Sequence, residues 1–145
     1  MSVAFALNPV PPETSDPTSE LARRCLYYMK MMREMEDRIE CKLYRQGKIL
    51  GGVYVGRGQE AIPVGAGLLA GPDDALFPSQ RDLALFLIRG VPPRNIFAQY
   101  MGRAGGLTRG RDGNMHMGDL RLNIVAIISA MAASVPTWSS ARPFA

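Results

Sequence analysis

The chain has 145 residues, of which 47% are hydrophobic and 21% charged, values typical of one globular domain with a sizeable core. Its net charge of +4 falls short of a nucleic-acid-binding composition, and no apolar run of about 18 residues could cross a membrane. We expect no signal peptide, because Asn8 and Pro9 end the short apolar start. Cys25 and Cys41 fall in one predicted helix, about 24 Å apart, too far for a disulfide, which favours a reducing, cytoplasmic location.

The first part of the chain divides into an arm and a long helix. Residues 1–17 are rich in proline and predict a flexible arm. Asp16 is the expected N-cap, because it precedes a proline at the first helical position, Pro17. Apolar residues then recur every three or four positions, which predicts an amphipathic helix that ends near Gly47.

Three shorter helices are predicted between turns rich in glycine and proline. The segment Ala61–Ala70 is made of small residues, which suits a buried or interfacial helix that another backbone approaches closely. Ser79 is the expected N-cap of a helix that runs up to Gly90, with Leu83, Phe86, Leu87 and Ile88 facing inward. Two prolines start the third helix, Asn95–Met101.

A basic loop follows the third of these helices. Six of the seventeen residues in Gly102–Gly118, the glycine–arginine loop, are glycine and three are arginine, so it is neither a helix nor a strand. Backbone amides and guanidinium groups in such a loop suit an anion such as phosphate. On composition alone we favour the alternative, a flexible, solvated basic connector, because such loops are common and phosphate-binding loops are few. The loop contains the only histidine, His116.

The residues after the loop indicate an α/β fold. The segment Leu122–Val135 is continuously apolar, with β-branched residues at its start and alanines near its end. This pattern predicts a buried strand that leads into a helix, a junction at which α/β sheets bind ligands.

Several motifs in order resemble one family, the alpha subunits of thiamine diphosphate-dependent 2-oxo acid dehydrogenases of the pyruvate and branched-chain type. The resemblance covers roughly residues 21–136, and the order and spacing of the motifs make it specific. It implies an α/β thiamine diphosphate-binding fold, with a mostly parallel sheet, helices on both faces and a preceding N-terminal helix. The motifs are a Met-rich first helix with Arg38, Gly58-Gln59-Glu60-Ala61, Phe77-Pro78-Ser79-Gln80-Arg81-Asp82, Arg89-Gly90, Met101-Gly102-Arg103 and Gly113-Asn114-Met115-His116.

The resemblance assigns roles to five residues. Arg81 matches the arginine that binds the cofactor's diphosphate, and Gln80 replaces the aromatic residue that usually precedes it. Ser129 falls where the branched-chain type places a serine against the cofactor, and Met131 where an apolar residue packs on the aminopyrimidine. His116 matches the histidine that ends the loop near the active-site entrance, although a surface histidine is the simpler explanation of that residue alone.

The resemblance also implies cofactors and partners. Thiamine diphosphate would serve oxidative decarboxylation of a 2-oxo acid, with acyl transfer to a lipoyl carrier. The family's Mg²⁺ ligands, a Gly-Asp-Gly motif and a later asparagine, do not occur in this sequence. We therefore expect the chain to be inactive alone and to bind cofactor and Mg²⁺ too weakly for calorimetry. The expected partners are the beta subunit and the lipoyl acyltransferase core.

The last residues depart from the family pattern. Residues 18–137 match the first part of the dehydrogenase domain, whereas 138–145 do not continue its small-residue helix. A one-base shift after the Thr137 codon would permit Val-Val-Val-Gly-Ala-Ala-Leu, close to the family sequence. We therefore expect a frameshift, true or from a sequencing error, that truncates a longer subunit.

The sequence leaves alternatives open both for the substrate and for the class of function. The loop up to His116 resembles the pyruvate type, whereas residues 127–136 resemble the branched-chain type, which we slightly favour. A different class is a non-catalytic binding module whose glycine–arginine loop contacts nucleic acid or a phosphorylated partner. A third possibility is a structural remnant that pairs with the beta subunit through Ala61–Ala70.

Overall fold

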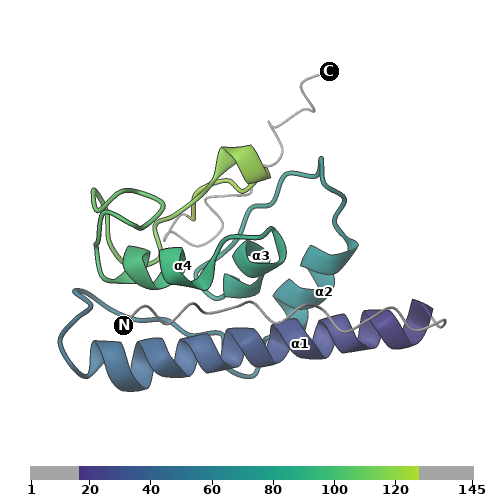
Figure 1. The fold of residues 1–145 in the computed structure, drawn as a ribbon, viewed down its shortest axis with the longest axis horizontal. Helices are drawn as coiled ribbons and strands as arrows, with labels where there is room; N and C mark the ends of the chain where they lie inside the picture. The colour runs from purple at the N-terminus through teal and green to yellow at the C-terminus, as the bar shows by residue number, and fades with distance from the viewer. Residues whose placement is uncertain (1–16, 128–145) are drawn as a thin grey trace, which may run out of the picture.

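A computed structural model describes residues 17–127 of the chain. The first helix forms one long side of the molecule, and the shorter helices and the loops pack over it (Figure 1). The helical elements in chain order are α1 (Pro17–Arg38), the π-helix η1 (Ile39–Tyr44), α2 (Ala61–Leu69), α3 (Leu83–Ile88), α4 (Pro93–Tyr100) and the 3₁₀-helix η2 (Leu120–Leu122).

The long N-terminal helix is confirmed. It begins at Pro17 and continues through α1 and η1 as far as Tyr44. A turn then ends it at Gly47, whose φ of 66° lies in the left-handed region that glycine adopts readily. The expected cap Asp16 lies outside the described residues. Cys25 and Cys41 are both free, as expected of two distant positions on one helix.

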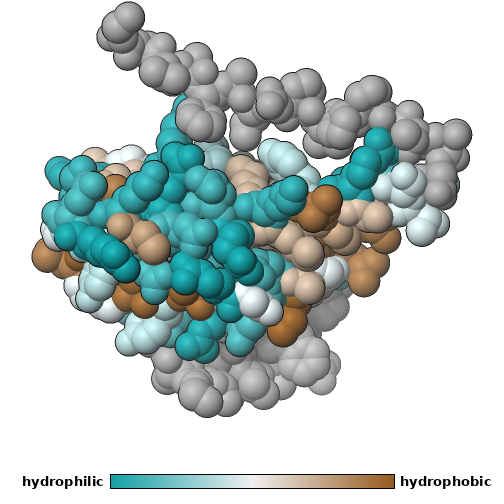
Figure 2. Space-filling view, turned by 90° about the horizontal axis from the view of Figure 1, so that it is seen from below, coloured by the Kyte–Doolittle hydropathy of each residue, from teal (hydrophilic) through white to brown (hydrophobic). Residues whose placement is uncertain are grey.

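The core lies between α1 and the short helices. Met32 of α1 and Ile39 of η1 are fully buried, together with Leu83 and Phe86 of α3. Gly67 of α2 lies so close to α3 that a Cβ atom there would approach side-chain atoms of Leu85 and Ile88 within 3 Å. The expectation that the small-residue helix allows close packing is therefore confirmed. Seen from the α1 side, much of the surface is hydrophilic, and hydrophobic residues lie among the hydrophilic ones in small groups (Figure 2).

The start of α3 differs from the sequence prediction. Ser79 does not cap this helix; Asp82 precedes its first residue, and its Oδ2 accepts a hydrogen bond from the Ser79 amide at 2.7 Å. In a serine cap, the Ser79 side chain would accept a hydrogen bond from a backbone amide of the helix. Here the Ser79 amide is the donor instead, because the Asp82 carboxylate is the stronger acceptor and reaches back to the turn. The predicted cap at Ser79 is wrong, although the predicted helix is confirmed.

The described residues contain no β-strand, so the expected parallel sheet is not present in 17–127. One parallel bridge pairs Leu76 with Ile124, at the position where the sequence predicts a strand. In this bridge the Leu76 amide donates to the Asn123 carbonyl, and the Val125 amide donates to the Leu76 carbonyl. Ile124 is fully buried, so the apolar run enters the core here. The predicted helix after this run falls in residues 128–145, outside the described part, as does most of the predicted arm at 1–16.

Candidate functional site: a segment that joins Arg81 to the glycine–arginine loop

Arg81 lies in the turn before α3 and presents its side chain to solvent. No carboxylate among residues 17–127 pairs with its guanidinium group, in contrast to Arg57, which binds Asp37 and Glu40. An exposed guanidinium without an acidic partner is able to bind an external anion in a bidentate manner. Gln80 precedes it and is half-buried. Ser129 and Met131, the other predicted cofactor contacts, lie outside the described residues.

Residues 51–58, which we call the 51–58 segment, contact both parts of the predicted site. Gly56 is buried against the turn before α3, where an added Cβ would lie 2.5 Å from the Arg81 carbonyl oxygen. The Asn114 side-chain amide donates a hydrogen bond to the Gly52 carbonyl at the other end of the segment. The 51–58 segment therefore joins Arg81 to the part of the glycine–arginine loop that contains His116.

His116 lies on the outer side of the loop, and its side chain is 46% exposed. Its Nδ1 atom lies 3.5 Å from Oδ2 of Asp112, a contact that strengthens when the imidazole is protonated. Met115 and Met117 on either side are buried in the core, which fixes the backbone at this position. His116 is thus accessible to a ligand while its neighbours anchor the chain.

Gln99 of α4 anchors the middle of the glycine–arginine loop, a role that the sequence analysis did not anticipate. This side chain is fully buried, and its Oε1 accepts hydrogen bonds from the amide and hydroxyl of Thr108, both at 2.9 Å. Its Nε2 donates to the Asp112 carbonyl at 3.2 Å. The loop packs so closely that a Cβ on Gly106 would lie 2.7 Å from the Gln99 Cα atom. The loop is therefore held in place rather than being a loose connector.

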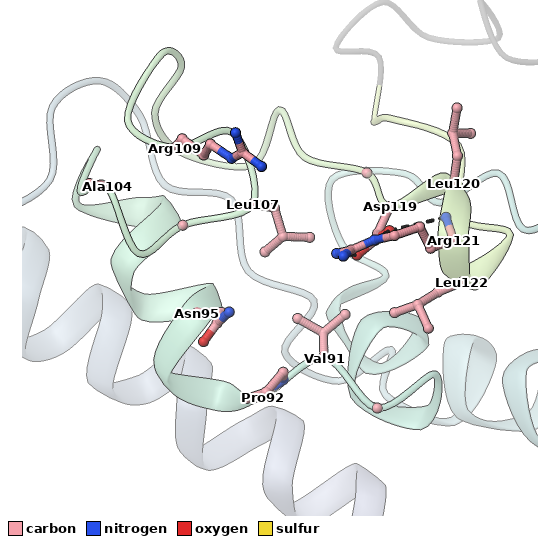
Figure 3. Close-up of a pocket in the computed structure, with 13 residues that line it drawn as sticks. Val91, Pro92, Asn95, Ala104, Leu107, Arg109, Asp119, Leu120, Arg121 and Leu122 are labelled. Atoms are coloured by element: carbon pink, nitrogen blue, oxygen red, sulfur yellow. Dashed lines mark hydrogen bonds and ion pairs between the residues drawn. The ribbon is translucent and has the colours of Figure 1, made fainter.

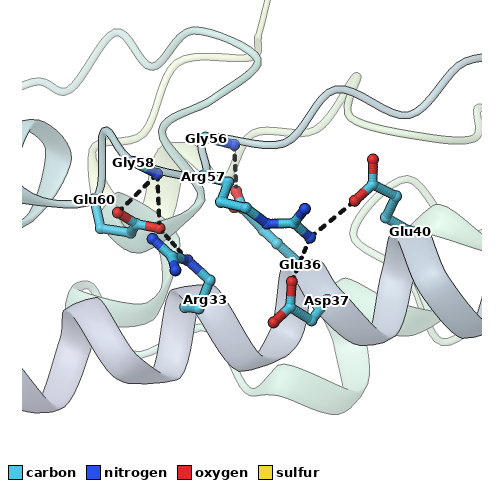
Figure 4. Close-up of polar contacts among 8 residues, drawn as sticks. All are labelled: Arg33, Glu36, Asp37, Glu40, Gly56, Arg57, Gly58 and Glu60. Atoms are coloured by element: carbon cyan, nitrogen blue, oxygen red, sulfur yellow. Dashed lines mark hydrogen bonds and ion pairs between the residues drawn. The ribbon is translucent and has the colours of Figure 1, made fainter.

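A polar network fixes the 51–58 segment to α1 (Figure 4). Arg33 donates to the Glu60 carboxylate at 2.5 Å, and both oxygens of that carboxylate accept the Gly58 amide at 3.1 Å. The hydrogen bond from Arg33 lowers the pKa of Glu60. Glu36 accepts the Gly56 amide at 3.0 Å. These charged side chains of α1 therefore bind a neighbouring segment of the chain rather than facing only solvent.

A separate cavity of about 900 Å³ lies between the α3–α4 turn, the glycine–arginine loop and η2. The side chains of Val91, Leu107 and Arg121 converge on it, and Arg109 lies at its edge (Figure 3). Arg121 is already paired with Asp119 at 2.7 Å. Among residues 17–127, none of Gln80, Arg81 and His116 lines this cavity, which is therefore separate from the turn that contains Arg81.

Two further properties concern the described residues alone. No helix among them is both long and apolar enough to cross a membrane. No group of three His, Cys, Asp or Glu residues between 17 and 127 is placed to hold a metal ion.

Comparison with known proteins decides the family. A family model described as "Dehydrogenase E1 component" matches residues 27–141, which include the 51–58 segment, Arg81 and the glycine–arginine loop. The chain belongs to this family. The suspected relationship to 2-oxo acid dehydrogenases is thus confirmed at the level of the E1 component.

The chain is similar to several curated members of the E1 family. It is 30% identical, over 127 residues, to "Pyruvate dehydrogenase E1 component subunit alpha" of Rickettsia prowazekii, covering 88% of this chain and 39% of that protein. It is 32% identical over 113 residues to the Porphyra purpurea protein of the same description, covering 78% and 33%. It is 32% identical over 137 residues to the mitochondrial subunit alpha-1 of Oryza sativa, covering 93% and 35%. The chain therefore spans little more than a third of the length of these relatives.

Proposed function

We propose that the chain forms part of the alpha subunit of a thiamine diphosphate-dependent 2-oxo acid dehydrogenase and contributes Arg81 to the cofactor's diphosphate. The observation that carries this proposal is the exposed Arg81 guanidinium, which has no acidic partner among residues 17–127, in a chain of the E1 family. A planar guanidinium matches the geometry of a diphosphate oxygen pair. The absence of a neighbouring carboxylate leaves its donors available for that anion.

The residues present fit the diphosphate end of the cofactor. Arg103, Arg109 and Arg111 of the glycine–arginine loop are exposed, and none of them forms an ion pair with a described residue. Their positive charge makes the loop favourable for a polyanion. Bound there, thiamine diphosphate would supply the electron sink for decarboxylation of a 2-oxo acid. The chain's own residues bind and orient the diphosphate, and His116 contributes an exposed imidazole near the entrance.

Arg81 can be tested with pyrophosphate, the inorganic form of the group it is proposed to bind. We expect millimolar pyrophosphate to shift the Arg81 Nε resonance of ¹⁵N-labelled chain in a saturable manner, whereas sodium chloride of equal ionic strength does not. The amides of the glycine–arginine loop are expected to shift in the wild type as well, and Arg81→Ala removes their shift. Arg94→Ala, which removes an exposed guanidinium from α4, is the matched control and leaves the response intact. Equal responses in the wild type and Arg81→Ala would contradict the proposed role.

The proposed substrate is a 2-oxo acid, and the relatives favour pyruvate. Each relative described above carries pyruvate dehydrogenase in its name. The slight preference for branched-chain substrates was based on residues 127–136, of which only Ile127 lies in the described part of the chain. Carbon dioxide release from pyruvate and from 3-methyl-2-oxobutanoate, compared in an assembled alpha–beta component, separates the two. A higher kcat/KM for pyruvate supports pyruvate, and the reverse order supports the branched-chain substrate.

The proposed partners are the beta subunit and, through the complex, the lipoyl acyltransferase core. The outer face of α2 supports an interface, because Ile62 is 68% exposed and Leu69 is 80% exposed. Gly65 lies between them with open space around its Cα, so a partner backbone could approach closely. We expect the wild-type chain to co-purify with a coexpressed beta subunit and Ile62→Lys to reduce recovery severalfold. The same substitution at exposed Leu50, on another segment, is the control; equal losses would argue against α2 as the interface. The family match lends no support to the nucleic-acid-binding alternative.

A further inference from the structure

Glu36 is a buried carboxyl group in the last turn of α1, with 1% of its surface exposed. It lies on the same helical stripe as Met32 and Ile39, which are fully buried. One oxygen accepts the Gly56 amide at 3.0 Å, whereas the other, Oε2, has no hydrogen-bond partner among the described residues. A carboxyl group in such a place costs folding free energy, so a role other than stability accounts better for its presence.

The hydrogen bond from Gly56 connects Glu36 to Arg81. An added Cβ on Gly56 would lie 2.5 Å from the Arg81 carbonyl oxygen and 2.7 Å from the Met32 methyl group. The Gly56 backbone therefore fills the space between α1 and the turn before α3. Because Glu36 holds the Gly56 amide, a change in that bond displaces the backbone against which Arg81 rests (Figure 4).

The groups around Glu36 place its titration near neutral pH. Burial raises its pKa to about 7, against the opposing effect of the Gly56 hydrogen bond. The negative charge of Glu60 raises the pKa further, whereas the positive charges of Arg33 and Arg57 lower it. On the α4 side lies Tyr100, whose own pKa is raised by burial and by the charge of Glu36. The phenol stays neutral in this range and leaves Glu36 as the titrating group.

We propose that Glu36 is a positioning residue for Arg81, which acts through the Gly56 amide and makes the placement of the diphosphate-binding arginine depend on the protonation of one buried carboxyl. The ionised carboxylate is the stronger acceptor for the amide, so it holds Gly56 and the Arg81 turn most firmly. The neutral acid holds them more loosely. The link to cofactor binding rests on the proposed function, whereas the coupling between Glu36 and Arg81 does not.

The coupling is tested without cofactor by a pH titration of ¹³C,¹⁵N-labelled chain. We expect the Gly56 amide and the Arg81 carbonyl carbon to shift with a common midpoint near pH 7. Glu36→Gln removes both transitions, and Glu36→Asp, which keeps a titrating group, retains a transition and guards against a folding defect in the first variant. Glu34→Gln alters an exposed carboxylate paired with Arg38 and leaves both transitions unchanged. A transition at Gly56 without one at Arg81, or no transition near pH 7, would overturn the inference.

A second titration separates this inference from the proposed function. Pyrophosphate affinity is measured at pH 6 and pH 8, on either side of the Glu36 titration, in the wild type and in Glu36→Gln. Pyrophosphate changes its own protonation between these pH values, but it does so equally in both experiments. The difference between the two proteins therefore measures the effect of Glu36 alone. For each protein, the affinity at pH 8 is divided by the affinity at pH 6. We expect this ratio to differ by at least about twofold between the wild type and Glu36→Gln. If the common transition is present but pyrophosphate never perturbs Arg81, the proposed function fails and the positioning of Arg81 by Glu36 stands.

Discussion

Replacing Glu36 with glutamine is expected to stabilise the chain by up to about 3 kcal/mol at pH 8 and to change its stability little at pH 5. The pKa of this carboxyl rises from an ordinary value of 4.5 to about 7 on folding. The folded chain therefore binds more protons than the unfolded chain between these values, and stability falls as the pH rises through that window. Glutamine keeps an acceptor for the Gly56 amide and has no charge to bury.

Urea unfolding at the two pH values, followed by circular dichroism, measures this effect. Glu34→Gln serves as the control, because Glu34 lies on the exposed face of the same helix. Its stability difference from the wild type should be the same at pH 5 and pH 8. A loss of stability at pH 8 in Glu36→Gln would show that the ionised carboxylate stabilises the fold, contrary to our account.

Replacing Gln99 with leucine is expected to cost about 2–4 kcal/mol and to release the glycine–arginine loop. The change removes the acceptor for the Thr108 amide and the donor to the Asp112 carbonyl, both in the loop that Gln99 anchors. Leucine has a similar volume, so lost hydrogen bonds rather than a cavity account for the cost.

Chemical denaturation and amide hydrogen exchange measure the two consequences of Gln99→Leu. We expect exchange to accelerate at Thr108 and its neighbours more than in α1. Gln46→Leu, at an exposed position in the turn after η1, should change stability by less than about 0.5 kcal/mol. If the loop amides of Gln99→Leu remain protected, Gln99 does not anchor the loop.

The helices could be predicted because they follow from local sequence. The spacing of apolar residues from Met32 to Ile39 and the proline at position 17 determine α1 with little help from the rest of the chain. The same holds for α4, whose first residue is Pro93. The cap of α3 was misjudged because Ser79 and Asp82 both favour helix starts, and only the backbone of the turn decides which side chain accepts a bond.

The candidate site was predicted only in part, because its assembly depends on contacts between distant segments. Arg81 and His116 were found through the family motifs, whereas the 51–58 segment that joins their neighbourhoods has no such signal. Glu36 did carry a signal: an acidic residue four positions after Met32 falls on the buried stripe of α1. Gln99 carried none, since a polar residue in a short helix is normally exposed.

The predicted sheet remains a prediction outside residues 17–127. Its apolar run begins in the described part, where Ile124 pairs with Leu76 in a single parallel bridge. One bridge does not make a strand, because a strand needs successive hydrogen bonds with a neighbour. Membership of the E1 family supports the α/β thiamine diphosphate-binding fold as the proposed architecture.

The central claim is that this chain binds the diphosphate of thiamine diphosphate through Arg81. Its most direct test is a titration of ¹⁵N-labelled chain with thiamine diphosphate and, in parallel, with thiamine. We predict that millimolar thiamine diphosphate, which binds too weakly for calorimetry, shifts the Arg81 Nε resonance and the Gly102–His116 amides, and that thiamine shifts neither. Equal responses to both compounds, or no response of Arg81 to the diphosphate, would contradict the claim.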